Sequence, residues 1–262
     1  MPIIVHSSIS IRRPDEREFV RISYAVSGHV FAIHNEFGRF FEEGIYKWEL
    51  ARRMGGIELE VPVEVSFGDY RKTYFLDALA SGCAIFEFKA VEALTDRHRS
   101  QLFNYLMLCD LPHGKLFNVR TEEVKHEFAN AVVASDVRRR FDVDEADWSE
   151  FGPIPIREWF TGFVRDMGTG LDVSLYEDAL TFHLGGEEFV ERRVDVKSQD
   201  AVIGHQSFRF AGPAAWKITT LNEQTERFVP HAHRLLKHCN LPALQWINVA
   251  RDRLTFRTLL PN

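Results

Sequence analysis

The sequence lacks any long run of apolar residues, which argues against a protein that spans a membrane. No window approaches 18 uncharged apolar residues, whereas a helix that crosses a bilayer needs about 20. The opening stretch MPIIVHSSISIRR also lacks a basic segment before an apolar core. We therefore expect no signal peptide, no membrane partner and a cytoplasmic location.

Cysteine is scarce as well. The chain of 262 residues has three, Cys83, Cys109 and Cys239, and their spacing is not that of metal ligands. All three lie in apolar surroundings, so we expect buried, reduced thiols.

Positive charge is in shorter supply than negative charge. Lys and Arg number 32 against 38 Asp and Glu, giving a net charge of −6. This balance argues against a protein that coats nucleic acid without specificity, but it leaves room for a local basic groove beside an acidic site.

What the sequence does contain is a repeat. The stretch CDLPHGKLFNV begins at Cys109 and CNLPALQWINV begins at Cys239, an offset of 130 residues. The same offset relates other marked positions, namely Tyr46 with Tyr176, Gly55-Gly56 with Gly185-Gly186, Thr95 with Thr225 and Leu106 with Leu236. We interpret it as a tandem duplication, with domains at residues 17–128 and 153–260. Residues 129–152 are charged and weakly patterned, and we expect a linker with some helix there.

The patterns predict the same order of elements in each half: helices, three strands, a helix and a strand. In the first half, apolar residues recur every three or four positions over 18–38, although Gly28 weakens the prediction of an unbroken helix. A second helix is expected over 41–56, strands over 57–67, 71–80 and 83–90, a helix over 95–110 and a strand over 115–120. The fold class is therefore α/β, in the α+β sense.

The strand CAIFEFKA carries an acid and a base on one face. Residues two apart in a strand share a face, so Glu87 and Lys89 point the same way. Asp77 lies on the preceding strand, and a tight turn could bring it beside Glu87. Two carboxylates that close repel each other unless a cation lies between them, and oxygen ligands suit Mg²⁺ or Mn²⁺. With Lys89 beside them to orient or deprotonate a water, these residues favour metal-assisted hydrolysis of a phosphodiester.

Further polar residues could join this site. Glu43 lies in the second helix, and His98, Gln101 and Tyr105 share one face of the third. Each has an ordinary alternative. Glu87 and Lys89 could be a surface ion pair, the helix residues a solvated face, and the tyrosines core residues.

In combination these residues resemble the PD-(D/E)XK nuclease superfamily and, within it, the small GxxExxY family. The resemblance covers about Ile22 to Val119 and rests on Glu43 and Tyr46 after Gly38, on Asp77, on EFKAVEALT with Glu87 and Lys89, and on HRSQLFNYL. One position departs, because Phe40 stands where that family has a glycine.

The resemblance implies a fold, a cofactor and a partner. The fold would be two restriction-endonuclease-like α-βββ-α-β domains forming a pseudo-symmetric pair within the chain, and a homodimer stays open. Mg²⁺ or Mn²⁺ would bind Asp77, Glu87 and Glu43. DNA is expected in preference to RNA. The catalytic residues would be Asp77, Glu87, Lys89, Glu43 and Gln101, and the substrate-binding residues Tyr105, His98, Tyr46, Arg99 and Lys72.

The second half lacks this set. At the offset of 130 the site residues fall on Val173, Ser207, Lys217, Thr219, His231 and Leu235. We therefore expect a nuclease with its site in the first half and a degenerate second copy. The alternatives are a protein that binds nucleic acid or protein without cleavage, and a scaffolding module. Mn²⁺ binding through Asp77 and Glu87 would distinguish the nuclease from the scaffold.

Overall fold

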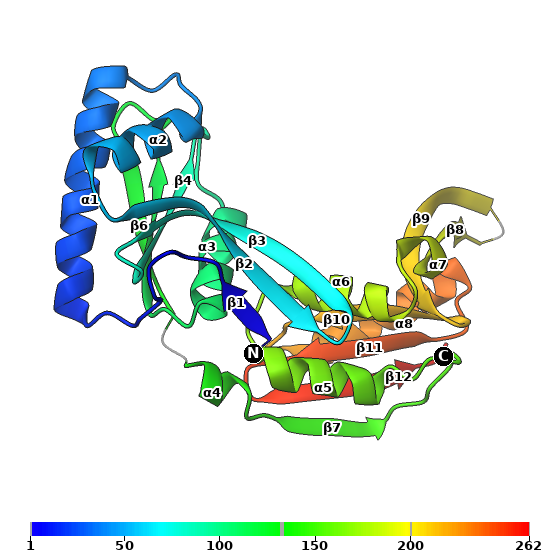
Figure 1. Cartoon of the computed structure of the whole chain (residues 1–262). Coiled ribbons are helices and arrows are strands. Elements are labelled where there is room, and N and C mark those ends of the chain that lie inside the picture. Colours follow the sequence, from blue (N-terminus) through cyan, green and yellow to red (C-terminus); the bar gives the residue numbers. More distant parts are fainter. Residues whose placement is uncertain (1, 132–133, 200, 262) are drawn as a thin grey trace. The chain divides into compact units, whose positions relative to one another are not determined.

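The computed structural model describes residues 2–131, 134–199 and 201–261 (Figure 1). Contacts divide the chain into residues 1–137, called unit one here, and residues 138–262, called unit two. None of the described helices is long and apolar enough to cross a membrane. The three cysteines are free and buried, as the sequence predicts.

Unit one is built on a six-stranded mixed sheet in the order β1-β2-β3-β4-β5-β6. Its elements are β1 (Ile3–Val5), α1 (Glu16–Phe37), α2 (Glu43–Arg53), β2 (Ile57–Phe67), β3 (Tyr70–Ala80), β4 (Ala84–Lys89), α3 (Asp96–Leu108), β5 (His113–Asn118) and β6 (Lys125–Asn130). Only β4 and β5 pair in parallel, which requires the crossover through α3.

Unit two is built on a second six-stranded mixed sheet, in the order β7-β12-β11-β10-β9-β8. The short helix α4 (Ser135–Arg138) precedes it. The elements that follow are β7 (Asp142–Asp147), α5 (Arg157–Met167), α6 (Val173–His183), α7 (Glu187–Val190), β8 (Glu191–Ser198), β9 (Ala201–Ala211), β10 (Ala214–Thr219), η1 (Thr225–Arg227), α8 (Phe228–Cys239), β11 (Leu244–Val249) and β12 (Arg253–Leu259).

Helix α1 shows how the local sequence fixes an element. The Asp15 carboxylate accepts the Glu18 N–H and caps the first turn, and the helix ends at Gly38, whose φ of 75° is costly for other residues. The helix runs unbroken through Gly28, although a mid-helix glycine costs about 1 kcal/mol. Burial of the apolar stripe that includes Ile22, Val26 and Val30 offsets this cost.

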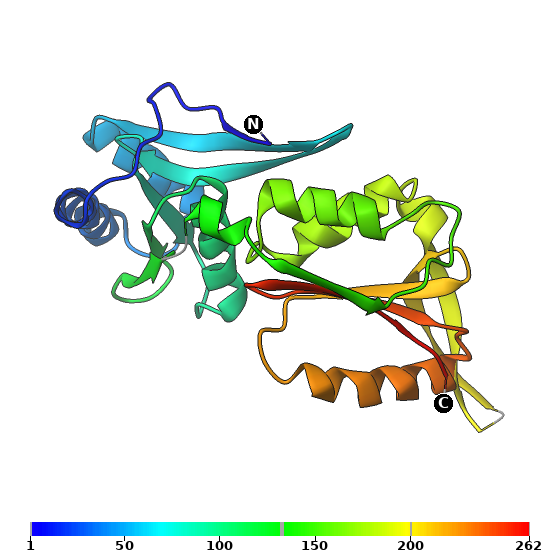
Figure 2. The ribbon, with the colours of Figure 1, turned by 90° about the horizontal axis from the view of Figure 1, so that it is seen from below.

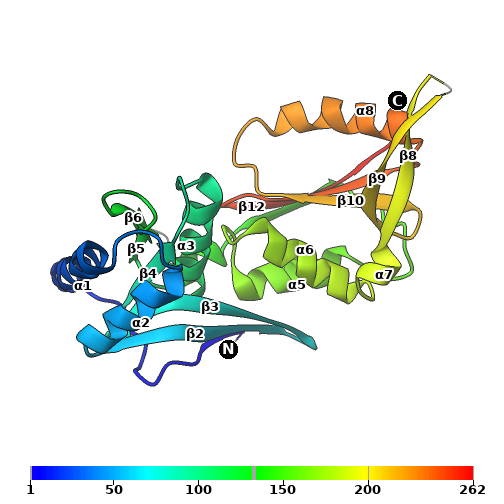
Figure 3. The same cartoon turned by 90° about the horizontal axis from the view of Figure 1, so that it is seen from above.

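The central strand β4 is covered on both faces. On one face Phe86 and Phe88 pack with Phe117 in a core cluster that also contains residues of α1 and α2. On the other face α3 lies close, because a Cβ added at Gly114 of β5 would come within 3.1 Å of Leu102 and Leu106. Figures 1 and 3 both show β4–β6 between α1 and α3. Glu87, in the middle of β4, is therefore almost completely shielded from water.

Unit two has the same layers within itself. Figures 2 and 3 show the sheet with α5 and α6 on one face and α8 on the other. Phe210, Leu236 and Trp246 belong to the cluster beneath α8. The single helix α8 thus occupies the position in its unit that α3 occupies in unit one.

The pairing of strands agrees between the units in detail. Ile85 pairs with Gly114 in the parallel ladder of unit one, and Ala215 pairs with Leu244 in that of unit two, 130 residues on at both positions. Asn118 exchanges two hydrogen bonds with the backbone of Val91. Asn248 makes the same two bonds with Leu221.

One turn differs by a residue. Three residues join β3 to β4, whereas Gly212 and Pro213 alone join β9 to β10. The antiparallel registers shift accordingly, so extending the sheet register places Phe208 opposite Lys217 in unit two, as Asp77 stands relative to Glu87. The sequence offset equates Asp77 with Ser207, and the sheet register corrects this to Phe208.

The fold class is confirmed as a mixture of helices with two mixed sheets. The expected helices and strands of the first half all form within a few residues of their predicted bounds. Strands β1, β6, β7 and β12 were not expected: β1 is short, β6 and β7 are highly charged, and β12 follows the last strand that the repeat predicts. The segment 129–152 contains α4 and β7, and β7 pairs in parallel with β12 of unit two.

Candidate active site

The candidate site lies where β3 and β4 stop pairing. Their ladder covers only Ala78 to Ala80 against Ala84 to Phe86. Beyond it, Asp77 enters the gap between the strands, and its Oδ2 accepts the Phe88 N–H at 2.8 Å. A side chain thus replaces the backbone carbonyl that the next rung would supply, which fixes the Asp77 carboxylate in the fork.

Glu87 and Lys89 meet Asp77 in this fork. The Lys89 Nζ donates to Glu87 Oε1 at 2.6 Å and lies 4.0 Å from Asp77 Oδ2. The Glu87 residue is only 1% exposed. Within the part of the chain that the structure describes, its buried Oε2 has no hydrogen-bond partner. A solvated surface ion pair does not have this burial, so the ordinary alternative for Glu87 and Lys89 does not describe them.

A buried lysine that the sequence analysis did not select completes the cluster. Lys47 of α2 donates to Asp77 Oδ1 at 2.8 Å and to Glu60, and it lies 4.0 Å from Glu43. Glu60 interrupts the ladder between β2 and β3 opposite Asp77 and has a φ of 50°. A residue other than glycine in this region carries backbone strain, and such strain gathers at functional sites.

Burial and like charge shift the acids of the cluster. Burial, followed by the neighbouring Asp77 carboxylate, raises the pKa of Glu87 to about 8, although Lys89 acts to lower it. Burial and Asp77 also raise the pKa of Glu43. Burial acts to lower the pKa of Lys47, but its hydrogen bonds to Asp77 and Glu60 outweigh burial and raise that pKa. Ionisation of these acids is therefore disfavoured in the fork, and a further cation there would favour it.

These residues fit a divalent cation by their chemistry. Four carboxylates, those of Glu43, Glu60, Asp77 and Glu87, face two ammonium groups. The oxygens of Asp77 and Glu87 are hard ligands, and Glu87 Oε2 is buried without a partner. In the described residues no three His, Cys, Asp or Glu side chains are gathered as a metal site. Mg²⁺ is commonly bound through only one or two carboxylates and keeps several waters, so the lack of a third gathered ligand among these residues does not conflict with such a site.

Gln101 and Tyr105 lie together on α3, as their spacing predicts. The Gln101 Nε2 donates to the Tyr105 hydroxyl at 2.9 Å. Burial raises the pKa of Tyr105 to about 12, and the charges of Glu87 and Asp77 act in the same direction. The neutral hydroxyl of Tyr105 is thus electrostatically coupled to the carboxylates, while Gln101 holds it in place.

The other expected contact residues have structural partners. Tyr46 is buried and its hydroxyl donates to the Gly38 carbonyl, and in unit two Tyr176 does the same to Gly168. His98 accepts the Thr95 N–H and completes the cap of α3.

Two of the expected basic contacts are also engaged. Arg99 binds Glu127 through two nitrogens and Asp96 through a third. The Lys72 ammonium lies 5.1 Å from the centre of the Tyr74 ring. These contacts give Arg99 and Lys72 a structural role. They do not test whether either residue also contacts a substrate.

Comparison with known proteins places unit one in context. Residues 20–131 match the model of the PD-(D/E)XK nuclease superfamily. The match covers α1 through β6 and includes the whole carboxylate cluster. It suggests a nuclease-like function for this segment, and nucleases of this superfamily generally use divalent metal ions. Comparisons with curated proteins and with solved structures found no match.

Sequence reasoning missed Lys47 and Glu60, although one signal for Lys47 was present. At the offset of 130, Lys47 falls on Glu177 while Glu87 falls on Lys217. Two charges that reverse together between matching positions of the two units indicate side chains that share one electrostatic environment. The sequence gave no such signal for Glu60, because its place in the cluster depends on its backbone conformation, which the sequence pattern does not reveal.

Proposed function

We propose that unit one is a metal-dependent nuclease that hydrolyses phosphodiester bonds of DNA. The observation that carries this proposal is the convergence of Asp77, Glu87 and Lys89 in the fork between β3 and β4, with a buried carboxylate oxygen left without a partner. The superfamily match over residues 20–131 supports the same reaction class.

Asp77 and Glu87 would hold the divalent cation, with Glu43 completing the acidic cluster. A cation bound there would polarise a phosphate oxygen and lower the pKa of a coordinated water. The ligand oxygens are fixed in advance. Asp77 is held by the Phe88 N–H and by Lys47, and Glu87 is held by Lys89.

We assign two roles to Lys89. It would orient the attacking water, and it would stabilise the negative charge that develops on the phosphate. Its ammonium lies between Glu87 and Asp77, so it can donate to an oxygen placed in the fork. Gln101 orients Tyr105, whose neutral hydroxyl can donate to a phosphate oxygen.

Unit two is proposed as a degenerate copy that arose by tandem duplication. The shared parallel register and the paired bonds of Asn118 and Asn248 support common descent. Lys217 and Thr219 stand where Glu87 and Lys89 stand, so this copy has no equivalent ligand set. Membership of the GxxExxY family within the superfamily is proposed on Glu43, Tyr46 and the Gln101-Tyr105 pair.

Cleavage assays test the proposal directly. Purified chain is incubated with single-stranded and duplex DNA, and with RNA, in Mg²⁺, Mn²⁺ or EDTA. Cleavage of DNA that requires the metal and disappears in Asp77→Asn and Lys89→Met is the expected result. Equal cleavage by these variants, with circular dichroism showing intact folding, would sink the proposal.

A second candidate is a protein that binds nucleic acid or protein on this fold without cleaving it. Lys47 favours it, because its ammonium already supplies a cation to Asp77, Glu60 and Glu43. Calorimetry with Mn²⁺ separates the two. No heat of binding in wild type, together with no cleavage, would favour the second candidate.

A further inference from the structure

Helix α8 of unit two lies in a segment with no acidic residue. Between Glu226 and Asp252 the sequence contains arginine, lysine and histidine but neither Asp nor Glu. The chain as a whole carries a net charge of −6, so this segment runs against the average. On α8 itself the basic side chains are His231, His233, Arg234, Lys237 and His238.

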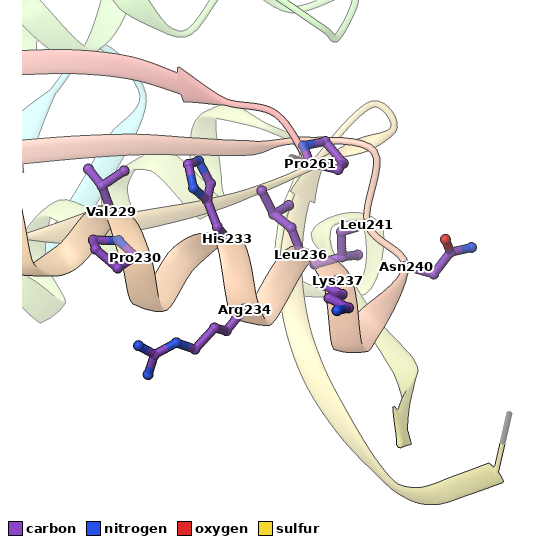
Figure 4. A pocket seen from close by; sticks show the side chains of 9 residues that line it. All are labelled: Val229, Pro230, His233, Arg234, Leu236, Lys237, Asn240, Leu241 and Pro261. Carbon is purple, nitrogen blue, oxygen red and sulfur yellow. The ribbon is translucent and has the colours of Figure 1, made fainter. Parts of the chain in front are cut away.

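A groove of about 630 Å³ runs along this helix (Figure 4). His233, Arg234 and Lys237 line it together with apolar side chains that include Val229, Leu236 and Leu241. In Figure 4 the Arg234 side chain extends away from the helix, while Val229 and His233 lie on its side toward the strands. Pro261, just after β12, contributes to the same lining. The groove therefore has an apolar part and a cationic part side by side.

Arg234 and Lys237, the two permanently charged side chains of the groove, are available to a ligand. Arg234 and Lys237 are exposed, and over residues 2–131, 134–199 and 201–261 neither side chain makes a hydrogen bond or ion pair. Arg99 on the corresponding helix of unit one is instead held by Glu127 and Asp96. Exposed cations that no acid neutralises attract a polyanion from solution.

We propose that the α8 groove binds single-stranded nucleic acid, with Arg234 and Lys237 on the phosphates and the apolar part against sugars and bases. Single-strand sites combine a positive track for the backbone with side chains, usually aromatic, against which unstacked bases pack. In this groove the imidazole of His233 and the apolar side chains would supply that surface. Duplex DNA keeps its bases stacked inside and would use only the cations. The binding needs neither metal nor cleavage, so it goes beyond the proposed nuclease activity and does not depend on it.

Fluorescence anisotropy tests the groove on the full chain in EDTA. The probe is a labelled oligothymidylate of about 20 nucleotides, longer than the footprint of a typical single-strand site. The groove variant carries Arg234→Glu and Lys237→Glu. The control carries Arg165→Glu and Arg193→Glu, which change net charge equally at exposed positions of the same unit outside the groove.

We expect the groove variant to bind at least about tenfold more weakly than the control. A milder variant, Arg234→Gln with Lys237→Gln, should lower the slope of log affinity against log salt by about 1.4, because two phosphate contacts on a single strand are lost. Equal weakening in both charge-reversal variants would mean that only net charge matters, and no binding by wild type would also overturn the proposal.

Competition distinguishes the occupants. Unlabelled oligothymidylate should displace the probe at lower concentration than either a duplex or polyglutamate of equal charge. Displacement by all three at equal charge would replace single-stranded nucleic acid with a general polyanion site. The groove substitutions should weaken binding by the same factor in an Asp77→Asn background, in which cleavage is expected to be absent. A failure of cleavage and a failure of groove binding are therefore separate results.

Discussion

The two units place opposite charges at matching positions. In unit one α2 supplies Lys47 and β4 supplies Glu87, whereas in unit two α6 supplies Glu177 and β10 supplies Lys217. Glu177 lies 2.9 Å from Arg209 and 3.9 Å from Lys217, so the helix acid is paired with strand cations. The same pair of strands thus forms with the acid and the base at either of the two positions. Strand β10 forms with Lys217 at the matching position, so the fold does not require an acid where Glu87 stands.

This comparison separates what the fold needs from what the site needs. Asn118 and Asn248 make the same backbone contacts in both units, and Tyr46 and Tyr176 bond matching glycines. These shared residues maintain the architecture. The residues that differ in charge are those proposed for the site, and among the described residues the four carboxylates of Glu43, Glu60, Asp77 and Glu87 gather in unit one.

The largest predicted effect is on cleavage, and matched substitutions in the two units measure it. Lys89→Met should lower the cleavage rate by about 100-fold or more, because a proton donor or charge stabiliser in the fork is lost. Lys217→Met in unit two should leave the rate unchanged. Initial rates at saturating Mn²⁺ provide the measurement. Comparable losses in both variants would mean that unit two takes part in the reaction.

A second prediction concerns stability. Lys47→Met should lower the free energy of unfolding of unit one by about 3 kcal/mol, because Asp77 loses its buried counter-ion. Glu177→Gln should cost unit two about 1 kcal/mol or less, since its partners Arg209 and Lys217 are 30% and 57% exposed. Hydrogen exchange of β3 and β9 reports each unit separately. Equal costs would show that the two ion-pair clusters are energetically alike.

The third prediction is a dependence on pH. The pKa of Glu87 is about 8 in the folded chain, above its ordinary value of 4.5, so the folded state binds more protons between these values. Stability in EDTA should fall as pH rises through this window, and the full penalty should apply above pH 8. Glu87→Gln removes the penalty. Its stabilisation should be near zero at pH 4.5 and should reach several kcal/mol at pH 8.5, because each unit of raised pKa is worth about 1.4 kcal/mol.

Denaturant unfolding at several pH values checks this behaviour, with Glu127→Gln as the control. Glu127 is a more exposed acid whose pKa is lowered by Arg99, so its substitution should not stabilise the chain as pH rises. A stabilisation by Glu87→Gln that does not change with pH would mean that Glu87 is not shifted.

The sequence predicted the main helices and strands and the grouping of Asp77, Glu87 and Lys89. It did not predict that Lys47 is the counter-ion of Asp77. Alternating apolar residues and glycine turns predicted β2, β3 and β4 closely, and the position of Asp77 and Glu87 in neighbouring strands followed from them. Lys47 escaped notice because a lysine on a helix is ordinarily solvated, and only tertiary packing buries this one. Strand β7 escaped because DVDEAD has the composition of a linker, and its pairing with β12 is non-local.

The smallest predicted effect compares two matching hydrogen bonds, those of Tyr46 and Tyr176, and asks whether each contributes equally to the stability of its unit. Tyr46→Phe and Tyr176→Phe each remove one buried hydroxyl that donates to a glycine carbonyl at the end of the preceding helix. Each should cost its own unit about 1 kcal/mol, the net value of one such bond. Hydrogen exchange of α1 and α5 measures both, and cleavage should be unaffected by either. Loss of cleavage in Tyr46→Phe with unchanged stability would instead assign Tyr46 to the substrate, and the two tyrosines would no longer be equivalent.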